Sequence, residues 1–127
     1  MRDIYHDLVP LHSIYPASHS GAKTGDVIID LQGFLGALII CYSGAITTDT
    51  VFQLMEGNES DLSDAAAVAD ADLLGSEPTL LAATDNEVKS FGYIGKKRYI
   101  RVDTTAGAGI AGALVVKGLP RHKPAVS

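Results

Sequence analysis

The pattern of apolar and polar positions is clearest between residues 87 and 104. Residues 97–104 alternate, with two apolar residues and an arginine on one face and a polar, mostly charged set on the other. The first face holds Arg98, Ile100 and Val102, and the second holds Lys97, Tyr99, Arg101 and Asp103. A period of two is typical of a half-buried β-strand. Residues 87–94 are also strand-like, so the break at Gly95 and Lys96 predicts a hairpin around which we expect the chain to be organised.

Further strand patterns occur along the chain, separated by turn residues. They cover residues 26–31, 34–43, 50–56, 79–84 and 110–117. The first two predict a core hairpin with its turn at Gln32 and Gly33, and the polar residues 44–49 predict a turn. Residues 62–74 are rich in Ala and Asp, with Asp61 or Ser63 as a possible N-cap and Gly75 at the far end, which fits one or two short helical turns.

These elements predict an all-β protein of one domain. About seven or eight short strands with Gly, Asn and Asp turns, and no long helical period, favour an antiparallel β-sandwich or a partly closed barrel with one short helical segment. Pro10 and Pro16 indicate an irregular arm or an edge strand near the N-terminus. We therefore expect an N-terminal arm (1–25), a β-sandwich domain (26–118) and a C-terminal tail (119–127).

Composition favours a subunit of a larger assembly. Hydrophobic residues make up 46% of the 127 residues, and the mean hydropathy is +0.18, more apolar surface than a small monomer usually hides. The longest apolar run, residues 34–42, is shorter than the ~20 residues that a membrane span needs. The charged N-terminus lacks the apolar core of a signal peptide, so we expect no Sec export. The single cysteine, Cys41, lies in the apolar run and is expected to be a packed core thiol rather than a catalytic one.

Three patterns suggest chemistry, and we expect each to have a structural explanation instead. Residues 107–112 match G-x-G-x-x-G but lack the helix and downstream acid of a dinucleotide site, so we expect a flexible loop. The aspartates of residues 61–72 lack the ligand order of an EF-hand, and the histidines lack zinc-site spacing. These residues are Asp61, Asp64, Asp70 and Asp72, and His6, His12, His19 and His122. The sequence therefore predicts no catalytic residue, no metal and no cofactor, and thus no enzyme.

The net charge of −5 hides a strong asymmetry along the chain. Residues 1–85 hold two basic residues against thirteen acids, a net charge of −11, and residues 86–127 hold eight basic residues against two acids, a net charge of +6. Nucleic acid would be repelled by most of the protein, whereas an acidic protein surface can meet the basic part alone. The expected partner contacts are Lys96, Lys97, Arg98 and Arg101. By alternation, Lys97 and Arg101 share the polar face, and Arg98 is expected at a rim or in an internal ion pair.

Four stretches carry a resemblance to a known family. They are DVIIDLQGF, DAAAVADADLLGSEP, NEVKSFGYIGKKRYIRV and GALVVKGLPRHKP, and they span about Asp26 to Pro124. In this order they resemble small capsid decoration, or cement, proteins encoded near the major capsid gene of tailed bacteriophages. The resemblance implies a β-rich virion protein that is assembled in the host cytoplasm and binds the outer capsid surface. There it would bridge subunits of the major capsid protein, alongside copies of itself, with no membrane or nucleic acid as partner.

Two other functions stay open at this point. One is a head completion or tail-tube protein of the same phage module. The other, from a different class, is a small cytoplasmic enzyme or ligand-binding barrel, which requires a convergent polar cluster in a pocket.

Overall fold

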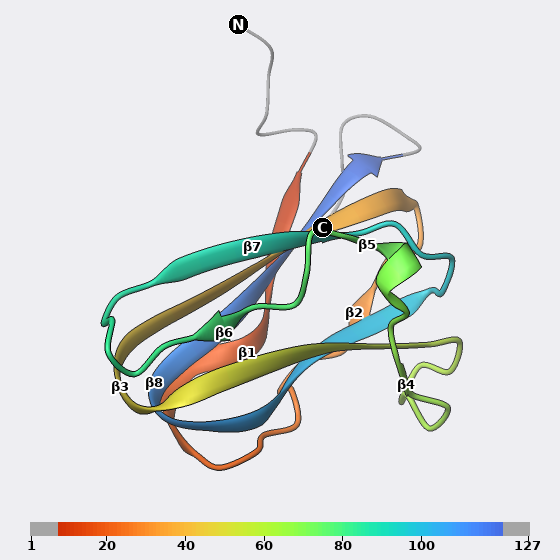
Figure 1. Cartoon of the computed structure of the whole chain (residues 1–127). Helices are drawn as coiled ribbons and strands as arrows, with labels where there is room; N and C mark the ends of the chain where they lie inside the picture. The colour runs from red at the N-terminus through yellow and green to blue at the C-terminus, as the bar shows by residue number, and fades with distance from the viewer. Residues whose placement is uncertain (1–7, 121–127) are drawn as a thin grey trace, which may run out of the picture.

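The computed structural model describes residues 8–120, and every strand in that range belongs to one antiparallel sheet of eight strands that does not close into a barrel (Figure 1). The predicted all-β class is therefore confirmed. Three of the strands are long, and the others have two to six residues. They are β1 (Val9–Ser20), β2 (Ile29–Asp30), β3 (Phe34–Gly57), β4 (Ala66–Ala67), β5 (Leu73–Leu74), β6 (Thr79–Leu80), β7 (Val88–Tyr93) and β8 (Tyr99–Pro120).

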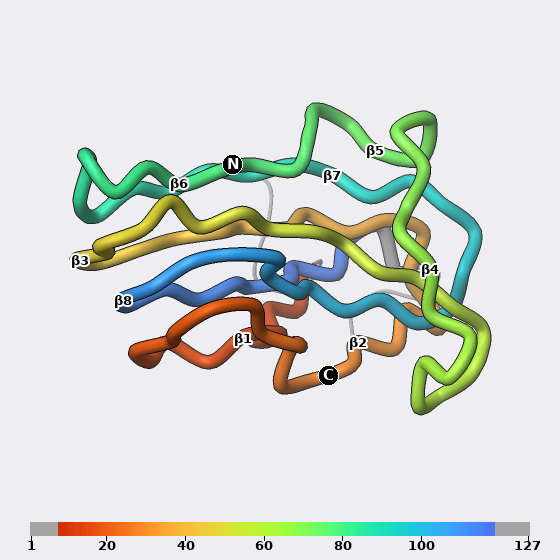
Figure 2. The backbone as a smooth tube through the Cα atoms, turned by 60° about the horizontal axis from the view of Figure 1, so that its bottom comes forward, coloured from red at the N-terminus to blue at the C-terminus, as the bar shows by residue number. Residues whose placement is uncertain are grey.

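The sheet is built on β3 and β8, which pair antiparallel along almost their whole length. The register runs from Phe34 opposite Pro120 to Gly57 opposite Tyr99. It is interrupted by shifts between Ser43 and Phe52, where both strands bend. Both bends lie at the same end of the molecule (Figure 2). The bend folds the sheet onto itself, which gives a sandwich-like arrangement of two layers.

Each layer adds its own strands to one half of β3 and β8. In the first layer the order is β1, β8, β3, β7 and β5. In the second layer, β2 pairs with the start of β8, while β4 and β6 pair with the end of β3. We call these the first and second layers below.

The core lies between the two layers and is built from alternate residues of each. In β3, Ile39 and Cys41 of the first layer and Leu54 of the second layer are fully buried. They belong to one continuous hydrophobic cluster with Ile100 and Val102 of β8. The alternation predicted for residues 97–104 is confirmed here, because Ile100 and Val102 point inward while Arg101 and Asp103 do not.

Two glycines of the 107–112 motif form the bend of β8. Gly107 has a φ of +153° and Gly109 a φ of +121°, values that residues with a side chain rarely adopt. A Cβ at Gly109 would also lie only 2.5 Å from the Cα of Ile46 in the facing strand. The expected flexible loop is therefore wrong. These glycines let one continuous strand turn a corner where two backbones touch.

The pairing predicted for the hairpins is also wrong. β7 pairs with β3 and not with β8, so residues 87–94 and 97–104 do not form a hairpin with each other. Likewise β2 pairs with β8 rather than with the strand that follows it, and residues 44–49 lie within β3 instead of forming a turn. The period of two identifies a strand but contains no information on which distant strand is its neighbour.

The N-terminal segment is part of the sheet. β1 pairs with β8 from Val9 opposite Lys117 to Ser20 opposite Ala108, so the edge-strand alternative is confirmed and the described part of the expected arm belongs to the domain. Pro10 and Pro16 lie in this edge strand, where a missing N–H is tolerated. His6, His122 and most of the expected tail lie outside the described residues.

The expected helical segment is reduced to a single 3₁₀ turn at Asp70–Asp72. Its N-cap position is Ala69, which makes no side-chain cap, so neither Asp61 nor Ser63 serves as the cap. Instead the Asp61 carboxylate accepts a hydrogen bond from the Ser63 N–H at 3.0 Å. Such local bonds favour turns over helix.

Candidate partner-binding surface

The predicted basic cluster begins in the loop that joins β7 to β8. This connection crosses from the first layer to the second at the end of the molecule opposite the bends (Figure 2). Lys96, Lys97 and Arg98 are all exposed here. Together with residues 31–36, the loop lines a hollow of about 510 Å³. We call residues 94–98 the basic loop.

The basic loop is held at several points. The Ile94 N–H donates to the Asp72 carbonyl oxygen at 2.8 Å, and the Leu31 N–H donates to the Arg98 carbonyl oxygen at 2.8 Å. Between these anchors, the Lys97 N–H donates to the Tyr93 hydroxyl at 3.2 Å. Since the backbone is tied on both sides, the lysine side chains project from a fixed base.

Tyr93 is the central anchor of this loop. Its side chain is almost fully buried, and its hydroxyl donates to Oε1 of Glu56 at 2.7 Å. Burial and the bond to the Glu56 carboxylate both raise the Tyr93 pKa, so the hydroxyl keeps its proton. Gly95 lies against this ring, and a Cβ there would overlap the hydroxyl group. Tyr93 therefore connects the first layer, the second layer and the basic loop.

Arg98 is in an internal ion pair, one of the two alternatives expected from its position. Its guanidinium group donates to both carboxylate oxygens of Asp30 at 2.9 Å and to Oε1 of Gln32 at 2.6 Å. It also lies 5.0 Å from the centre of the Tyr99 ring. The hydrogen bonds from Arg98 hold the pKa of Asp30 below its usual value. Gln32 lines the opposite wall of the hollow, so its hydrogen bond with Arg98 joins the two walls.

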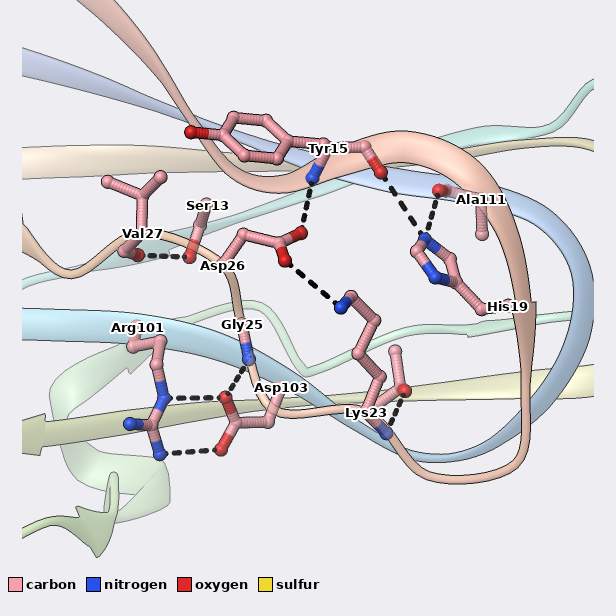
Figure 3. Close-up of polar contacts among 11 residues, drawn as sticks. Ser13, Tyr15, His19, Lys23, Gly25, Asp26, Val27, Arg101, Asp103 and Ala111 are labelled. Atoms are coloured by element: carbon pink, nitrogen blue, oxygen red, sulfur yellow. Dashed lines mark hydrogen bonds and ion pairs between the residues drawn. The ribbon is translucent and has the colours of Figure 1, made fainter.

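Arg101 lies elsewhere and is largely covered. Its guanidinium group makes two hydrogen bonds, of 2.7 and 2.9 Å, to the Asp103 carboxylate (Figure 3). Asp103 in turn accepts the Gly25 N–H at 2.8 Å. Only 16% of the Arg101 side chain is exposed, and Gly25 packs so closely on it that a Cβ would overlap its Cγ. Lys97 is exposed, whereas Arg101, which was expected to share the polar face with it, is covered by a connection distant in sequence.

Beside this covered pair, further polar contacts hold residues 21–27 and the end of β1 to the sheet (Figure 3), and we call the contacts of His19, Lys23 and Asp26 the polar clasp. Asp26 accepts the Tyr15 N–H at 3.0 Å and pairs with Lys23 at 3.0 Å. Partial burial opposes its charge, but these two contacts outweigh that effect and lower the Asp26 pKa. Nε2 of His19 lies 3.3 and 3.2 Å from the carbonyl oxygens of Tyr15 and Ala111, so this nitrogen carries a proton. The polar clasp therefore fixes the connection between β1 and β2 to the sheet.

The structure thus separates the four predicted contact residues. Arg98 and Arg101 make ion pairs within the chain, whereas Lys96 and Lys97 make none with residues 8–120. The hollow was not predicted, because its second wall comes from residues about sixty positions away. Among its lining residues there is no carboxylate, histidine, serine or cysteine. Its charged lining is basic, which suits an acidic group of a partner.

The other residues with possible chemistry have structural roles. Cys41 is fully buried, and desolvation raises the pKa of its thiol, so it is not a thiolate nucleophile. The Asp64 carboxylate accepts the N–H groups of Asn58 and Glu59 in its own loop. Within residues 8–120, no group of three or more His, Cys, Asp or Glu residues is placed to hold a metal ion. None of the described helices is long and apolar enough to cross a membrane.

Comparison with known proteins gives no relative: no protein-family model matches the chain, and no curated protein is similar enough to count as a match.

Proposed function

We propose that this chain is a structural virion protein that binds the outer surface of a tailed-phage capsid and stabilises the shell by bridging major capsid protein subunits. The observation that carries the proposal is the anchored basic loop beside a hollow, in a protein that is otherwise acidic. The all-β fold and the resemblance of the four sequence stretches support the same role. No part of the proposal requires catalysis.

Lys96 and Lys97 are the proposed contacts with the shell. Each is exposed, and neither makes an ion pair with residues 8–120, so an acidic side chain of the capsid can approach without displacing an internal partner. The hollow between residues 31–36 and the basic loop would receive the segment that carries this acid. At an exposed rim, each such ion pair contributes up to about 1 kcal/mol to the free energy of binding.

Small contacts are sufficient when they are repeated. A decoration subunit that touches several capsid subunits binds through all of them at once, so weak individual contacts give a strong total attachment. The loop must then be rigid, because a flexible loop would lose conformational entropy on binding. The hydrogen bonds of Tyr93 and Leu31 provide that rigidity.

The proposal is tested by binding the purified protein to capsid shells that lack it. We expect Lys96→Glu/Lys97→Glu to lose most of its occupancy, and the wild type to bind more weakly as salt rises. The charge control is Lys23→Glu/Lys89→Glu, which changes the net charge equally at two described lysines that pair within the chain, with Asp26 and Glu87, and should bind nearly as the wild type does. Circular dichroism checks that both variants fold. Equal occupancy of the two variants, or tight binding of the wild type to duplex DNA at physiological salt, would contradict the proposal.

A further inference from the structure

The outward face of the first layer is apolar. Register and alternation place these residues on it: Pro10 and His12 of β1; Gly112, Leu114, Val116 and Gly118 of β8; Gly36, Leu38, Ile40 and Tyr42 of β3; Val88, Ser90 and Gly92 of β7; and Leu74 of β5. Among these described residues there is no Asp, Glu, Lys or Arg. Several are strongly exposed, including Val88 at 68% and Leu74 at 59%. We call this surface the apolar face.

Glycines make the apolar face flat. A Cβ at Gly92 would lie 3.2 Å from Cβ of Leu74, and one at Gly112 would lie 2.7 Å from the Tyr42 hydroxyl. Larger side chains therefore lie across the glycines instead of standing up from the sheet. A flat, uncharged sheet surface is suited to packing against another sheet.

The other layer has a different outward face. There Arg101 and Asp103 pair with Met55 and Gln53 of β3, beneath the polar clasp. The charge of the described sheet is thus concentrated on the second layer, and solvent is its natural environment. Contiguous apolar surface of the kind found on the first layer is rare on soluble monomers and marks an interaction site.

We propose that the apolar face packs against the same face of a second copy of this chain to form a two-fold dimer. Charge does not oppose this occupant: each copy has a net charge of −5, but the two apolar faces bring no charged side chains together. Size also fits. Seven residues of β3 and five adjacent strands, at a rise of about 3.4 Å and a spacing of about 4.8 Å, give roughly 500 Å² per copy. Two copies then bury about 1,000 Å², the lower limit for a specific interface.

The relief of the apolar face determines the orientation of the two copies. A shallow groove of about 300 Å³ lies at one end and is lined by Leu38, Leu74 and Val116, among others. Val88 of the apolar face, and Ile110, which lies on the same side of β8 by alternation, are exposed toward the bend, at the opposite end. A two-fold axis perpendicular to the strands, in the plane of contact, places the groove of each copy against the raised end of the other.

Dimerisation does not depend on the proposed function, because it is expected of the purified protein without any capsid. The test is sedimentation over about 1 to 200 µM, the range in which an interface of this size is expected to associate. We expect the wild type to reach twice the 13.3 kDa of the chain, and we expect high salt to leave the dimer intact. Leu38→Glu should be a monomer, as should Val88→Glu, which tests the opposite end of the face.

The matched control is Leu35→Glu, in the same strand. Leu35 is 60% exposed, but it lies on the opposite side of β3 by alternation, so its variant should remain a dimer. A monomeric wild type at 200 µM would overturn the proposal, whether the terminal residues or the capsid cover the face instead. Dimers of both Leu38→Glu and Val88→Glu would overturn it as well, because they would place the contact elsewhere. Neither result would alter the expected salt-dependent binding to shells.

Discussion

The buried hydroxyl group of Ser13 contributes to the stability of the fold. This residue lies at a register shift of β1, between His12 and Ile14, and its side chain is fully buried. Its Oγ accepts the Val102 N–H at 2.9 Å and donates to the Val27 carbonyl oxygen at 3.1 Å. One hydroxyl group thus joins β1, the first half of β8 and the connection that carries the polar clasp.

Replacement of Ser13 by alanine should destabilise the protein measurably. The substitution leaves the Val102 N–H without an acceptor in a fully buried position. An unsatisfied buried group of this kind costs about 1–3 kcal/mol in free energy of unfolding. For a domain of this length, 1 kcal/mol corresponds to roughly 3–5 °C in Tm. We therefore expect Ser13→Ala to lower the Tm by roughly 3–15 °C without changing the fold.

The assay is urea unfolding followed by far-UV circular dichroism, with Ser18→Ala as the control because Ser18 is exposed in the same strand. The control should change the free energy of unfolding by less than about 0.5 kcal/mol. Hydrogen exchange at the Val102 amide adds a local readout, and exchange should be faster in Ser13→Ala alone. A Ser13→Ala protein as stable as the control, with unchanged exchange at Val102, would show that the Ser13 hydroxyl group does not stabilise the fold.

Two further predictions concern the bend and the core. Gly109→Ala should destabilise the protein by several kcal/mol in a thermal or urea melt, because it combines a positive φ with overlap against the Ile46 backbone. The control is Gly44→Ala, which has ordinary contacts with the facing strand and should change the free energy of unfolding by no more than about 1 kcal/mol in either direction. Equal destabilisation by the two substitutions would contradict the role of Gly109 in the bend. Cys41 should react with thiol reagents only after urea unfolds the protein, since it is fully buried, and rapid labelling of the native protein would contradict its place in the core.

The sequence was sufficient to predict most of the strands and the buried face of residues 97–104, but not the partners of those strands. The alternation at Ile100 and Val102 is local, and it appears in the structure as predicted. The pairing of β7 and β8 with β3, in contrast, depends on contacts between residues more than forty positions apart. Glycines at Gly107 and Gly109 resemble a loop in sequence, because a bend in a long strand and a loop need the same backbone freedom.

The candidate surface was predictable to a similar degree. The basic cluster was evident from charge alone. The sequence did not show that its arginines form ion pairs within the chain while Lys96 and Lys97 form none with residues 8–120. Arg98 meets Asp30, and Arg101 is covered by Gly25, through contacts that only the folded chain creates. Lys96 and Lys97 therefore remain the available charges. The high mean hydropathy indicated excess apolar surface. It could not indicate that this surface lies on the first layer, because a mean over the chain contains no positions.

Electron cryomicroscopy of purified particles would show whether many copies of this chain coat a capsid. We expect density for this fold repeated over the outer surface of the shell, with the basic loop facing the major capsid protein. A single ring at one vertex, or density along the tail, would assign the chain to head completion or the tail tube. Particles without the protein would contradict a structural role in the virion altogether.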